Sequence, residues 1–490
     1  MKKPNFVIFM TDHQRGDTVY PGIAKMPNLN RFLSKSVTFS QAYCPSPHCC
    51  PSRASFFSGL YPSEHGVWNN VNVPNALSRG LHDGVKLFSQ DLAETGYNLY
   101  FSGKWHVSVE EGPADYGFEM IDGKNGSGVK YRNVPDVSGW GQYTGNPANL
   151  SKENDERNEG EIVRPGYFRY KQYGVSEDPF NDSAVVESAV NKIKTLDMNT
   201  EPFLMYAGVL GPHDPYIPPQ RFLDMYDIDD IILPKNFYDT MEDKPAMYRR
   251  VRDRYSQLTE REHRESLRHY LAHCTYEDYL FGQLLEAVEN SEVADNTVVI
   301  YLSDHGDYAG SHGLWAKGLP CFKEAYNISC VVGGAGIKNP GRVSDEFISL
   351  TDFAPTILEL AGVDISNKSD EPNKKRFAGK SIAGLLKDEQ NAEQFREYLY
   401  TQTNGNEQYG IQRAVFSKKY KYVFNGFDYD EFYDLEADPD EMVNQINNPA
   451  YKAEIRDMCG RMWSFAKENS DDISNSYIFT ALAPYGPGII

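Results

Sequence analysis

Four short apolar runs along the chain each lead into polar residues of the kinds that enzymes use for chemistry. The runs, with the residues that follow them, are 6–10 with Asp12 and His13, 97–101 with Lys104 and His106, 203–207 with His213, and 298–302 with Asp304 and His305. Short continuous apolar runs are typical of strands buried on both faces of a parallel sheet. In open α/β sheets, ligands bind in the crevice beyond the carboxyl ends of the strands. The pattern predicts that these polar residues converge at one edge of a sheet.

Helical periodicity lies between the apolar runs. Residues 183–193 and 279–288 each place their apolar side chains on one helical face, directly before the strands expected at 203–207 and 298–302. Alternation of helix and strand predicts an α/β fold, a large mostly parallel sheet flanked by helices. The charged segment 260–273 is interpreted as a solvated helix face.

Two segments depart from this alternation. Residues 107–182 are rich in glycine, tyrosine, asparagine and charge, and predict a long insertion over the sheet, a place where lids and specificity elements occur. A polar stretch at 367–375 suggests a boundary near residue 385, giving a catalytic domain at 1–385 and a smaller C-terminal lobe at 386–490. In that lobe we expect antiparallel strands at 398–401, 412–416 and 420–424, followed by a helix at 453–467.

Composition restricts the partners of this 490-residue chain. Its formal net charge of −20 argues against binding to nucleic acid or to an anionic membrane, since both are polyanions. An anionic substrate would therefore need a local cluster of positive charge. Residues 6–10 are too short for the apolar core of a signal peptide, about 7–15 residues. We expect a cytoplasmic protein, or a periplasmic or secreted one if a leader was removed.

The adjacent pair Cys49-Cys50 stands out among seven scattered cysteines, which do not suggest a disulfide framework. Pro51 fits the first position of a helix and Gly59 fits its C-terminal stop. Cys49 would then lie at a helix N-terminus, where the dipole favours negative charge, as a reactive thiol or an anion site requires. The alternative is a buried helix start with two inert cysteines.

This segment resembles the signature of the sulfatase family, because Cys49, Pro51, Ser52, Arg53 and Gly59 all match it. Other segments resemble that family in the same order along the chain: 27–33, 103–106, His213 with Pro215, 304–306 with Lys317, and 432–441. Six motifs in one order make a chance match improbable. The resemblance implies a fold of the alkaline-phosphatase-like superfamily.

The resemblance also implies a nucleophile. In sulfatases, a separate maturation enzyme oxidises the cysteine matching Cys49 to a formylglycine aldehyde. One hydroxyl of the hydrated aldehyde would attack sulfur, and the second would later expel sulfate, so that one hard step becomes two easier ones. Arg53 and Lys104 would hold the hydrate and its charge, and His106 would take the proton during elimination.

The remaining roles implied by the resemblance concern the leaving group and a metal. His213 and Lys317 would face the sulfate and the leaving oxygen, and one of them would protonate the departing alcohol. Asp12, Asp304 and His305 are the best matches to the family's metal ligands. Oxygen-rich ligation makes Ca²⁺ the expected ion, with Mn²⁺ and Mg²⁺ as alternatives.

His13 is a departure from the family pattern, because many sulfatases have a second aspartate at this position. Imidazole suits transition metals better than Ca²⁺. Either His13 is a ligand and the site leans towards Mn²⁺, or His13 lies aside and water takes its place. The full predicted metal set, with the nucleophile on the same ion, is Asp12, His13, Cys49, Asp304 and His305.

The expected activity is hydrolysis of a sulfate ester on a small sulfated carbohydrate or oligosaccharide, with the 107–182 insertion setting substrate choice. One alternative is a phosphonate monoester or phosphodiester hydrolase that uses the same formylglycine chemistry. Another is a non-catalytic carbohydrate-binding relative in which Cys49 stays unmodified. The intact set of basic residues and metal ligands argues against this last alternative.

Overall fold

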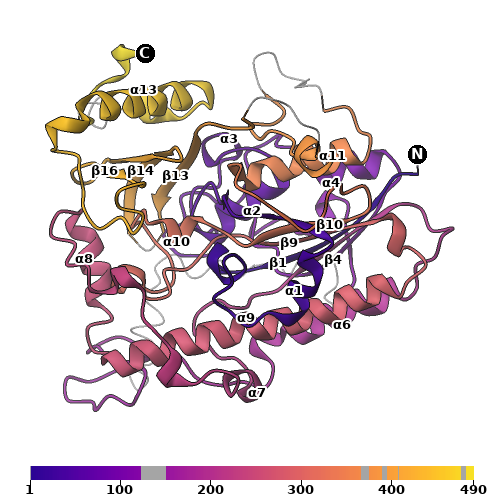
Figure 1. Cartoon of the computed structure of the whole chain (residues 1–490), viewed down its shortest axis with the longest axis horizontal. Helices are drawn as coiled ribbons and strands as arrows, with labels where there is room; N and C mark the ends of the chain where they lie inside the picture. Colours follow the sequence, from indigo (N-terminus) through magenta and orange to yellow (C-terminus); the bar gives the residue numbers. More distant parts are fainter. Residues whose placement is uncertain (1, 123–149, 366–374, 389–393, 407, 476–481) are drawn as a thin grey trace.

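An 8-stranded sheet runs through the middle of the molecule (Figure 1). This computed structural model describes residues 2–122, 150–365, 375–388, 394–406, 408–475 and 482–490. The strands lie in the order β11 (Arg342–Ser344), β2 (Ser36–Phe39), β10 (Cys330–Gly334), β9 (Thr297–Ser303), β1 (Asn5–Thr11), β8 (Phe203–Gly208), β4 (Asn98–Gly103) and β5 (Glu119–Met120). The four predicted apolar runs are the neighbouring strands β9, β1, β8 and β4. All four are parallel, which confirms the α/β fold.

The inner strands are apolar without alternation because helices cover both faces of the sheet. Every residue of β1, β8 and β9 is buried. Met10 of β1 pairs with Leu302 of β9 and with Gly208 of β8, and Gly208 pairs in turn with Gly103 of β4. This register brings the carboxyl ends of all four strands to one edge. β10 is the exception in the sheet, since it is antiparallel to β9 and to β2.

Helices form one layer on each side of the sheet (Figure 1). Val7 and Phe9 of β1 face a core that includes α1 (Pro27–Leu33), α6 (Asp182–Ile193), α7 (Gln220–Leu223) and α9 (Glu260–Glu289). Ile8 and Met10 face the opposite core, which includes α2 (Cys49–Ser58), α4 (Phe88–Glu94) and α11 (Phe353–Leu360). The helices predicted at 183–193 and 279–288 are confirmed as α6 and the end of α9.

The interpretation of residues 260–273 as a solvated helix face is wrong. The segment is the first half of α9, and Glu262, His269 and many of its other residues are buried. The insertion covers them: Arg157 forms an ion pair with Glu262, and the ring of Tyr173 lies 4.7 Å from that of His269. Glu262 is therefore paired under the insertion, whereas Glu260 and Arg261 at the start of the helix remain exposed. Residues 123–149 of the predicted insertion lie outside the described residues.

The C-terminal lobe is an antiparallel sheet covered by one helix. Its strands are β13 (Leu399–Gly405), β14 (Tyr409–Phe416), β15 (Tyr420–Asn425) and β16 (Glu431–Asp434), and its helix is α13 (Lys452–Glu468). Val415 faces α13, whereas its neighbours Ala414 and Phe416 join the core of the catalytic domain. The three predicted strands and the helix are confirmed, and β16 was not predicted. The boundary near residue 385 stays a prediction.

Shorter elements complete the described fold. They are α3 (Pro62–His65), α8 (Ala246–Asp253), α10 (Lys323–Tyr326), α12 (Ala383–Leu386), the pair β3 (Ala42–Tyr43) with β12 (Ile348–Ser349), and the pair β6 (Glu161–Ile162) with β7 (Tyr170–Lys171). Among the described residues, no helix is both long enough and apolar enough to cross a bilayer.

Candidate active site

The carboxyl edge of the sheet meets the N-terminus of α2. Cys49, the first residue of α2, places its Sγ 3.6 Å from Asp12 Oδ1 and 3.3 Å from His305 Nε2. Asp12 directly follows β1, and His305 comes two residues after β9. The structure brings all the predicted site residues into one connected cluster: Asp12, His13, Cys49, Arg53, Lys104, His106, His213, Asp304, His305 and Lys317.

The position of Cys49 depends on the complete burial of α2. All residues of this helix are buried, and it begins at Cys49, two residues before the predicted start at Pro51. The helix ends at Gly59, which has a left-handed φ of 74°. A Cβ at Gly59 would lie 2.7 Å from a ring carbon of Phe377, so glycine is needed for both conformation and space. The dipole of α2 points its positive end at Cys49.

Arg53 holds the carboxylates that follow β1 and β9. Its side chain is fully buried one turn after Cys49. Nε donates to Asp304 Oδ2 at 2.7 Å, and Nη2 donates to Asp12 Oδ2 at 3.2 Å. Nη1 donates to the Tyr206 hydroxyl at 3.0 Å. A buried cation is tolerated only with this kind of complete pairing, so Arg53 fixes the spacing of the two acids as well as their charge.

The surroundings of Cys49 stabilise negative charge. Burial acts to raise the pKa of its thiol, but Lys104, Lys317 and His305 outweigh burial and hold that pKa well below its ordinary value. Lys104 Nζ also contacts Asp12 Oδ2. By contrast, burial raises the pKa of the neighbouring Cys50 thiol. The site is therefore preorganised for an anionic atom at the Cys49 position.

His106 lies beside Cys49 with a ring nitrogen that can accept a proton. Its Nε2 is 2.9 Å from Asn72 Oδ1, an oxygen that accepts, so Nε2 carries the ring proton. Nδ1 is buried and has no hydrogen-bond partner among the described residues. Burial and the charge of Lys104 lower the pKa of His106. Asn72 was not predicted, because no pattern in its loop distinguishes it from an ordinary turn residue.

His213 and Lys317 form the opposite wall. Lys317 Nζ lies 3.3 Å from His213 Nε2, and His213 Nδ1 lies 3.3 Å from Asp214 Oδ1. The Tyr170 hydroxyl donates to Asp214 Oδ2 at 2.7 Å. Burial and Lys317 act to lower the pKa of His213, but Asp214 and the Cys49 side chain raise it above its ordinary value. This wall can hold a proton near the cluster, as a general acid must.

His13 and His305 each direct Nε2 towards the cluster. His13 Nδ1 lies 2.8 Å from Asp307 Oδ2, and His305 Nδ1 lies 2.8 Å from the Gly306 carbonyl, so each Nδ1 carries its ring proton. Burial and Lys317, whose Nζ contacts His13 Nε2, lower the pKa of His13. Asp307 was not predicted, although it follows Asp304 within the same strand-end segment.

Two overlapping groups of side chains have the spacing of metal ligands. In each group the ligand atoms lie within 4.8 Å of one another. The groups are Asp12, Cys49, Asp304 and His305, and Asp12, His13, Cys49 and His213. These groups offer carboxylate oxygens together with imidazole nitrogens. The Nδ1 atoms of His13 and His305 are hydrogen-bonded to acceptors, which leaves Nε2 to face an ion. Such a donor set fits a divalent metal ion. The presence of His213 in the second group was not expected.

Comparison with known proteins identifies the family. The model of the sulfatase family matches residues 4–363, and the model for the C-terminal region of N-sulphoglucosamine sulphohydrolase matches residues 310–468. The chain belongs to the sulfatase family. It is therefore a sulfuric ester hydrolase with the fold of the alkaline-phosphatase-like superfamily, as the motif resemblance implied.

The relatives of this sulfatase differ in their substrates. The choline-sulfatase of Rhizobium meliloti is 26% identical, over 94% of this chain and 87% of the relative. The structure of a 2-O GAG sulfatase has a TM-score of 0.72 at 21% identity, covering 97% of this chain and 94% of the other. The phosphonate monoester hydrolase of Agrobacterium radiobacter has a TM-score of 0.73 at 18% identity, covering 95% and 96%. The two structural matches show the fold alone.

A cavity of about 420 Å³, here called the entrance pocket, adjoins the candidate site, because Lys317 is one of the residues that line it. Lys317 also contacts His213 of the candidate site. The other residues that line the pocket are Arg164, Arg250, Val251, Asp253, Arg254, Gly318, Leu319, Asn406 and Gln408. They come from the insertion, from α8 and the residue after it, from the segment after Lys317, and from the turn between β13 and β14. The C-terminal lobe therefore contributes to the approach to the site.

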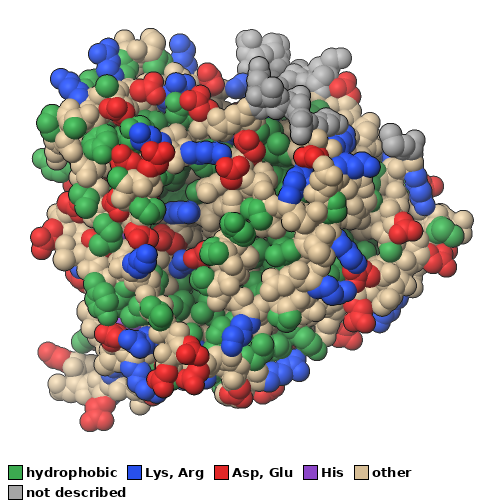
Figure 2. Space-filling model, viewed as in Figure 1, with side chains coloured by type: hydrophobic (Ala, Val, Ile, Leu, Met, Phe, Trp, Pro, Cys, Tyr) green, Lys and Arg blue, Asp and Glu red, His purple; other side chains and the backbone are tan. Residues whose placement is uncertain are grey.

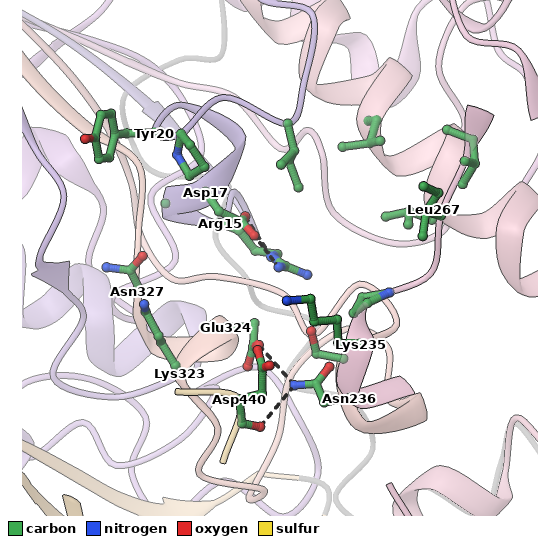
Figure 3. Close-up of a pocket in the computed structure, with 18 of the residues that line it drawn as sticks. Arg15, Asp17, Tyr20, Lys235, Asn236, Leu267, Lys323, Glu324, Asn327 and Asp440 are labelled. Atoms are coloured by element: carbon green, nitrogen blue, oxygen red, sulfur yellow. Dashed lines mark hydrogen bonds and ion pairs between the residues drawn. The ribbon is translucent and has the colours of Figure 1, made fainter. Parts of the chain in front are cut away.

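A larger cavity of about 860 Å³ lies apart from the predicted chemistry (Figure 3). None of the predicted site residues lines it. Its charges are balanced within the wall: Arg15 forms an ion pair with Asp17, and Asn236 Nδ2 contacts Glu324 Oε1 at 3.4 Å. Acidic and basic side chains are similarly interspersed over the face of the molecule in Figure 2. The size of this cavity alone does not mark it as the active site.

Proposed function

We propose that this sulfatase hydrolyses a sulfate ester on a small sulfated carbohydrate, with a formylglycine made from Cys49 as its nucleophile and a divalent metal ion. The observation that carries the proposal is the position of Cys49 Sγ at the N-terminus of α2, where nearby cations and His305 hold its pKa down. Sγ stands in this structure for the hydroxyl oxygen of the hydrated aldehyde. That oxygen must be anionic to attack sulfur.

The metal would be held by the two carboxylates and the imidazoles that face Cys49. Asp12, Asp304 and His305 would be ligands, and His13 would complete the set. When bound, a divalent ion lowers the pKa of a coordinated hydroxyl and neutralises sulfate oxygens. The orientation of His13 supports the alternative in which His13 is a metal ligand. The hydrogen bond from His13 Nδ1 to Asp307 turns His13 Nε2 towards Asp12 Oδ1, which lies 3.7 Å away. A donor set with two imidazoles favours Mn²⁺ over the Ca²⁺ expected from the family.

The side chains around the nucleophile would divide the proton transfers between them. Arg53 and Lys104 would stabilise the negative charge of the hydrate, which lies between them. His106, with Nδ1 unprotonated, would accept the proton of the second hydroxyl when sulfate is expelled. His213, with its raised pKa, and Lys317 would hold the sulfate oxygens and supply the proton to the leaving alcohol.

The entrance pocket supports a carbohydrate sulfate over choline sulfate as the substrate. Choline carries a fixed positive charge, which the arginines that line the pocket would repel. Sugar hydroxyls suit the amide side chains of Asn406 and Gln408 in the same wall. A carbohydrate sulfate is also the kind of substrate indicated for the 2-O GAG sulfatase that shares this fold.

Mass spectrometry of the Cys49 peptide, with an aryl sulfate assay, tests the proposal. The protein would be produced with a formylglycine-generating enzyme, and 4-nitrophenyl sulfate would be the substrate. We expect an aldehyde at Cys49 and turnover that Cys49→Ala abolishes. Metal analysis of the same preparation should find Mn²⁺ in preference to Ca²⁺ when both are supplied. Cys50→Ala is the matched control and should leave the aldehyde and the activity in place.

Other outcomes would favour the alternative functions. An aldehyde with turnover of phenyl phosphonate esters but not of sulfate esters would replace the proposal with a phosphonate monoester hydrolase. An unmodified and inactive Cys49, despite the maturation enzyme, would favour a non-catalytic carbohydrate-binding protein.

A further inference from the structure

A further group of side chains with the spacing of metal ligands lies outside the candidate active site. His312, Glu324 and Glu441 each offer one ligand atom, and these atoms lie within 4.8 Å of one another. His312 follows β9, Glu324 lies in α10, and Glu441 follows β16 of the C-terminal lobe. The two groups at the candidate active site share no residue with this one. Segments that are distant in the sequence therefore meet at a separate set of donor atoms.

His312 directs a ring nitrogen into this group without a hydrogen bond. Its Nδ1 lies 2.7 Å from Asp239 Oδ2, which accepts, so Nδ1 carries the ring proton. The ring stacks on that of Phe322 with the centroids 3.5 Å apart, which fixes its plane. Nε2 is buried and has no hydrogen-bond partner among the described residues. A carboxylate that holds the outer nitrogen of a histidine is the usual companion of a metal-bound imidazole.

Glu324 brings a negative charge that no ion pair with a described residue balances. Its Oε1 accepts from Asn236 Nδ2 at 3.4 Å, and this amide is neutral. Its Oε2 is buried and has no hydrogen-bond partner in the described part of the chain. Arg15, whose charge acts on Glu324, is itself paired with Asp17. A buried carboxylate oxygen without a partner is costly, and a bound cation would remove that cost.

The other carboxylates around the ring already have cations. Lys421 Nζ contacts Glu441 Oε1, and Lys244 Nζ lies 3.1 Å from Asp239 Oδ2. Each ammonium group balances one carboxylate, which leaves Glu324 as the third. An ionised carboxylate has about four lone-pair sites, so Glu441 can bind an ion and keep its contact with Lys421.

The group adjoins the larger cavity, through which an ion can enter. Glu324 and Asn236 both line that cavity, and Figure 3 shows the contact between them. Asn236 Oδ1 is also buried without a hydrogen-bond partner among the residues that the structure describes. Unpartnered acceptors from three segments of the chain therefore lie in one part of the molecule.

We infer that His312 Nε2, Glu324 and Glu441 form a second metal site that binds Zn²⁺. One imidazole and two carboxylates are a donor set that suits Zn²⁺, with water in the fourth position. Through Glu441, the ion would join the C-terminal lobe to the segment that leads to Lys317. It would lie apart from Cys49, so the inference does not depend on the proposed function.

The zinc content of the protein after gel filtration in metal-free buffer tests the inference. Wild type, E324Q, H312Q and D12N would be loaded with Zn²⁺, filtered and analysed by inductively coupled plasma mass spectrometry. E324Q removes the unbalanced charge with little change of shape, and D12N removes a ligand of the ion proposed at the active site. Asp230→Asn is the control, because Asp230 lines the same cavity but is not part of the group.

E324Q and H312Q should each retain one zinc ion fewer per chain than the wild type. D12N should keep the ion that E324Q loses, and D230N should match the wild type. This difference is expected whether or not an ion also binds at the active site. Zinc should raise the midpoint of thermal unfolding of D12N more than that of a D12N/E324Q variant, because a ligand that binds only the folded state stabilises it.

A crystal structure of the zinc-loaded wild type, with anomalous scattering recorded at the zinc edge, locates the ion without any substitution. A peak about 2.0–2.1 Å from His312 Nε2 would support the inference. No peak there would overturn it, as would equal zinc contents of the wild type and E324Q. Zinc that all the proteins lose on gel filtration would be an adventitious ion only and would overturn it as well. If E324Q does not fold, the crystal structure of the wild type still decides.

Discussion

The candidate active site, here called the centre, and the entrance pocket both gather positive charge, but they hold it in different ways. In the centre, Arg53 is buried, Lys104 has 9% of its side chain exposed, and each contacts a carboxylate. At the entrance, Arg164 and Arg250 are exposed, and neither forms an ion pair with a described residue. Buried charges must be paired because their desolvation is costly, whereas exposed charges remain hydrated and are screened by salt. The cations of the centre therefore support the fold as well as the proposed chemistry, whereas the exposed cations of the entrance are not needed for the fold.

The largest expected effect comes from breaking the buried pairs of the centre. Arg53→Met leaves Asp12 and Asp304 without their shared partner. We expect kcat/KM on 4-nitrophenyl sulfate to fall by at least about 10³-fold. Stability to urea should fall by about 3–5 kcal/mol, because uncompensated charge remains buried.

Arg413 in the C-terminal lobe is the matched control for Arg53. It is also buried and paired, with Nε 2.5 Å from Asp471 Oδ2. Arg413→Met should lose stability by a comparable amount, while the folded enzyme keeps its kcat. Equal loss of kcat in the two variants would mean that activity follows stability and not the site.

A smaller effect is expected from Lys317, which lies where the two regions meet. Lys317→Ala should lower kcat by about 10²–10³-fold, as for other groups that stabilise charge in a transition state. If Lys317 helps to protonate the leaving alcohol, the loss will be larger for alkyl sulfates than for 4-nitrophenyl sulfate, whose leaving group needs no proton. Measuring kcat of Lys317→Ala and of the wild type on a series of aryl and alkyl sulfates gives the dependence of the loss on the leaving group. An identical loss across the series would restrict Lys317 to sulfate binding.

Asp307→Asn should disturb the predicted metal ligands through His13, the predicted ligand to which Asp307 is hydrogen-bonded. An asparagine amide can donate to Nδ1 and so reverse the tautomer, which would turn a protonated Nε2 towards Asp12. We expect the metal concentration for half-maximal activity to rise about 10–100-fold. Asp17→Asn, which removes the partner of Arg15 in the other cavity, should leave that concentration unchanged. A metal requirement unaffected by Asp307→Asn would place His13 outside the ligand set.

The smallest expected effect is the change in protein stability when an arginine of the entrance pocket is replaced. Arg250→Gln should shift the free energy of unfolding by less than about 0.5 kcal/mol, because an exposed side chain without an ion pair contributes little. Urea denaturation of this variant beside Arg53→Met measures the contrast. A loss above 1 kcal/mol would show that the entrance arginines also support the fold.

Local patterns predicted the parts of the site that depend on one strand or one helix. The apolar runs before Asp12 and Asp304 predicted where these acids lie, because strands buried on both faces show no alternation. The helix from Cys49 to Gly59 was likewise predicted, apart from a start two residues earlier than expected. The roles of these residues came from the family resemblance and stay predictions.

Contacts between distant segments were not predicted. The start of α9 was misinterpreted because its charge pattern resembles that of an exposed helix, and only the fold places Arg157 over Glu262. Asp307 and Asn72 orient His13 and His106 across the site, and no local periodicity marks such partners. The entrance pocket combines four regions of the chain, so the set of side chains that line it cannot be read from any one of them.

The burial of α2 has a consequence for the order of events in the cell. Cys49 is 1% exposed, and the ring of Phe56 packs 5.8 Å from that of Phe353 in α11. A ribosome adding about 5–20 residues per second needs roughly 15–60 s to proceed from Cys49 to Phe353. Until then the helix lacks part of its cover, and an oxidising enzyme can still reach the thiol. Under the proposed formylglycine chemistry, the share of chains that acquire the aldehyde should therefore depend on translation speed, and slow codons between these positions should increase it.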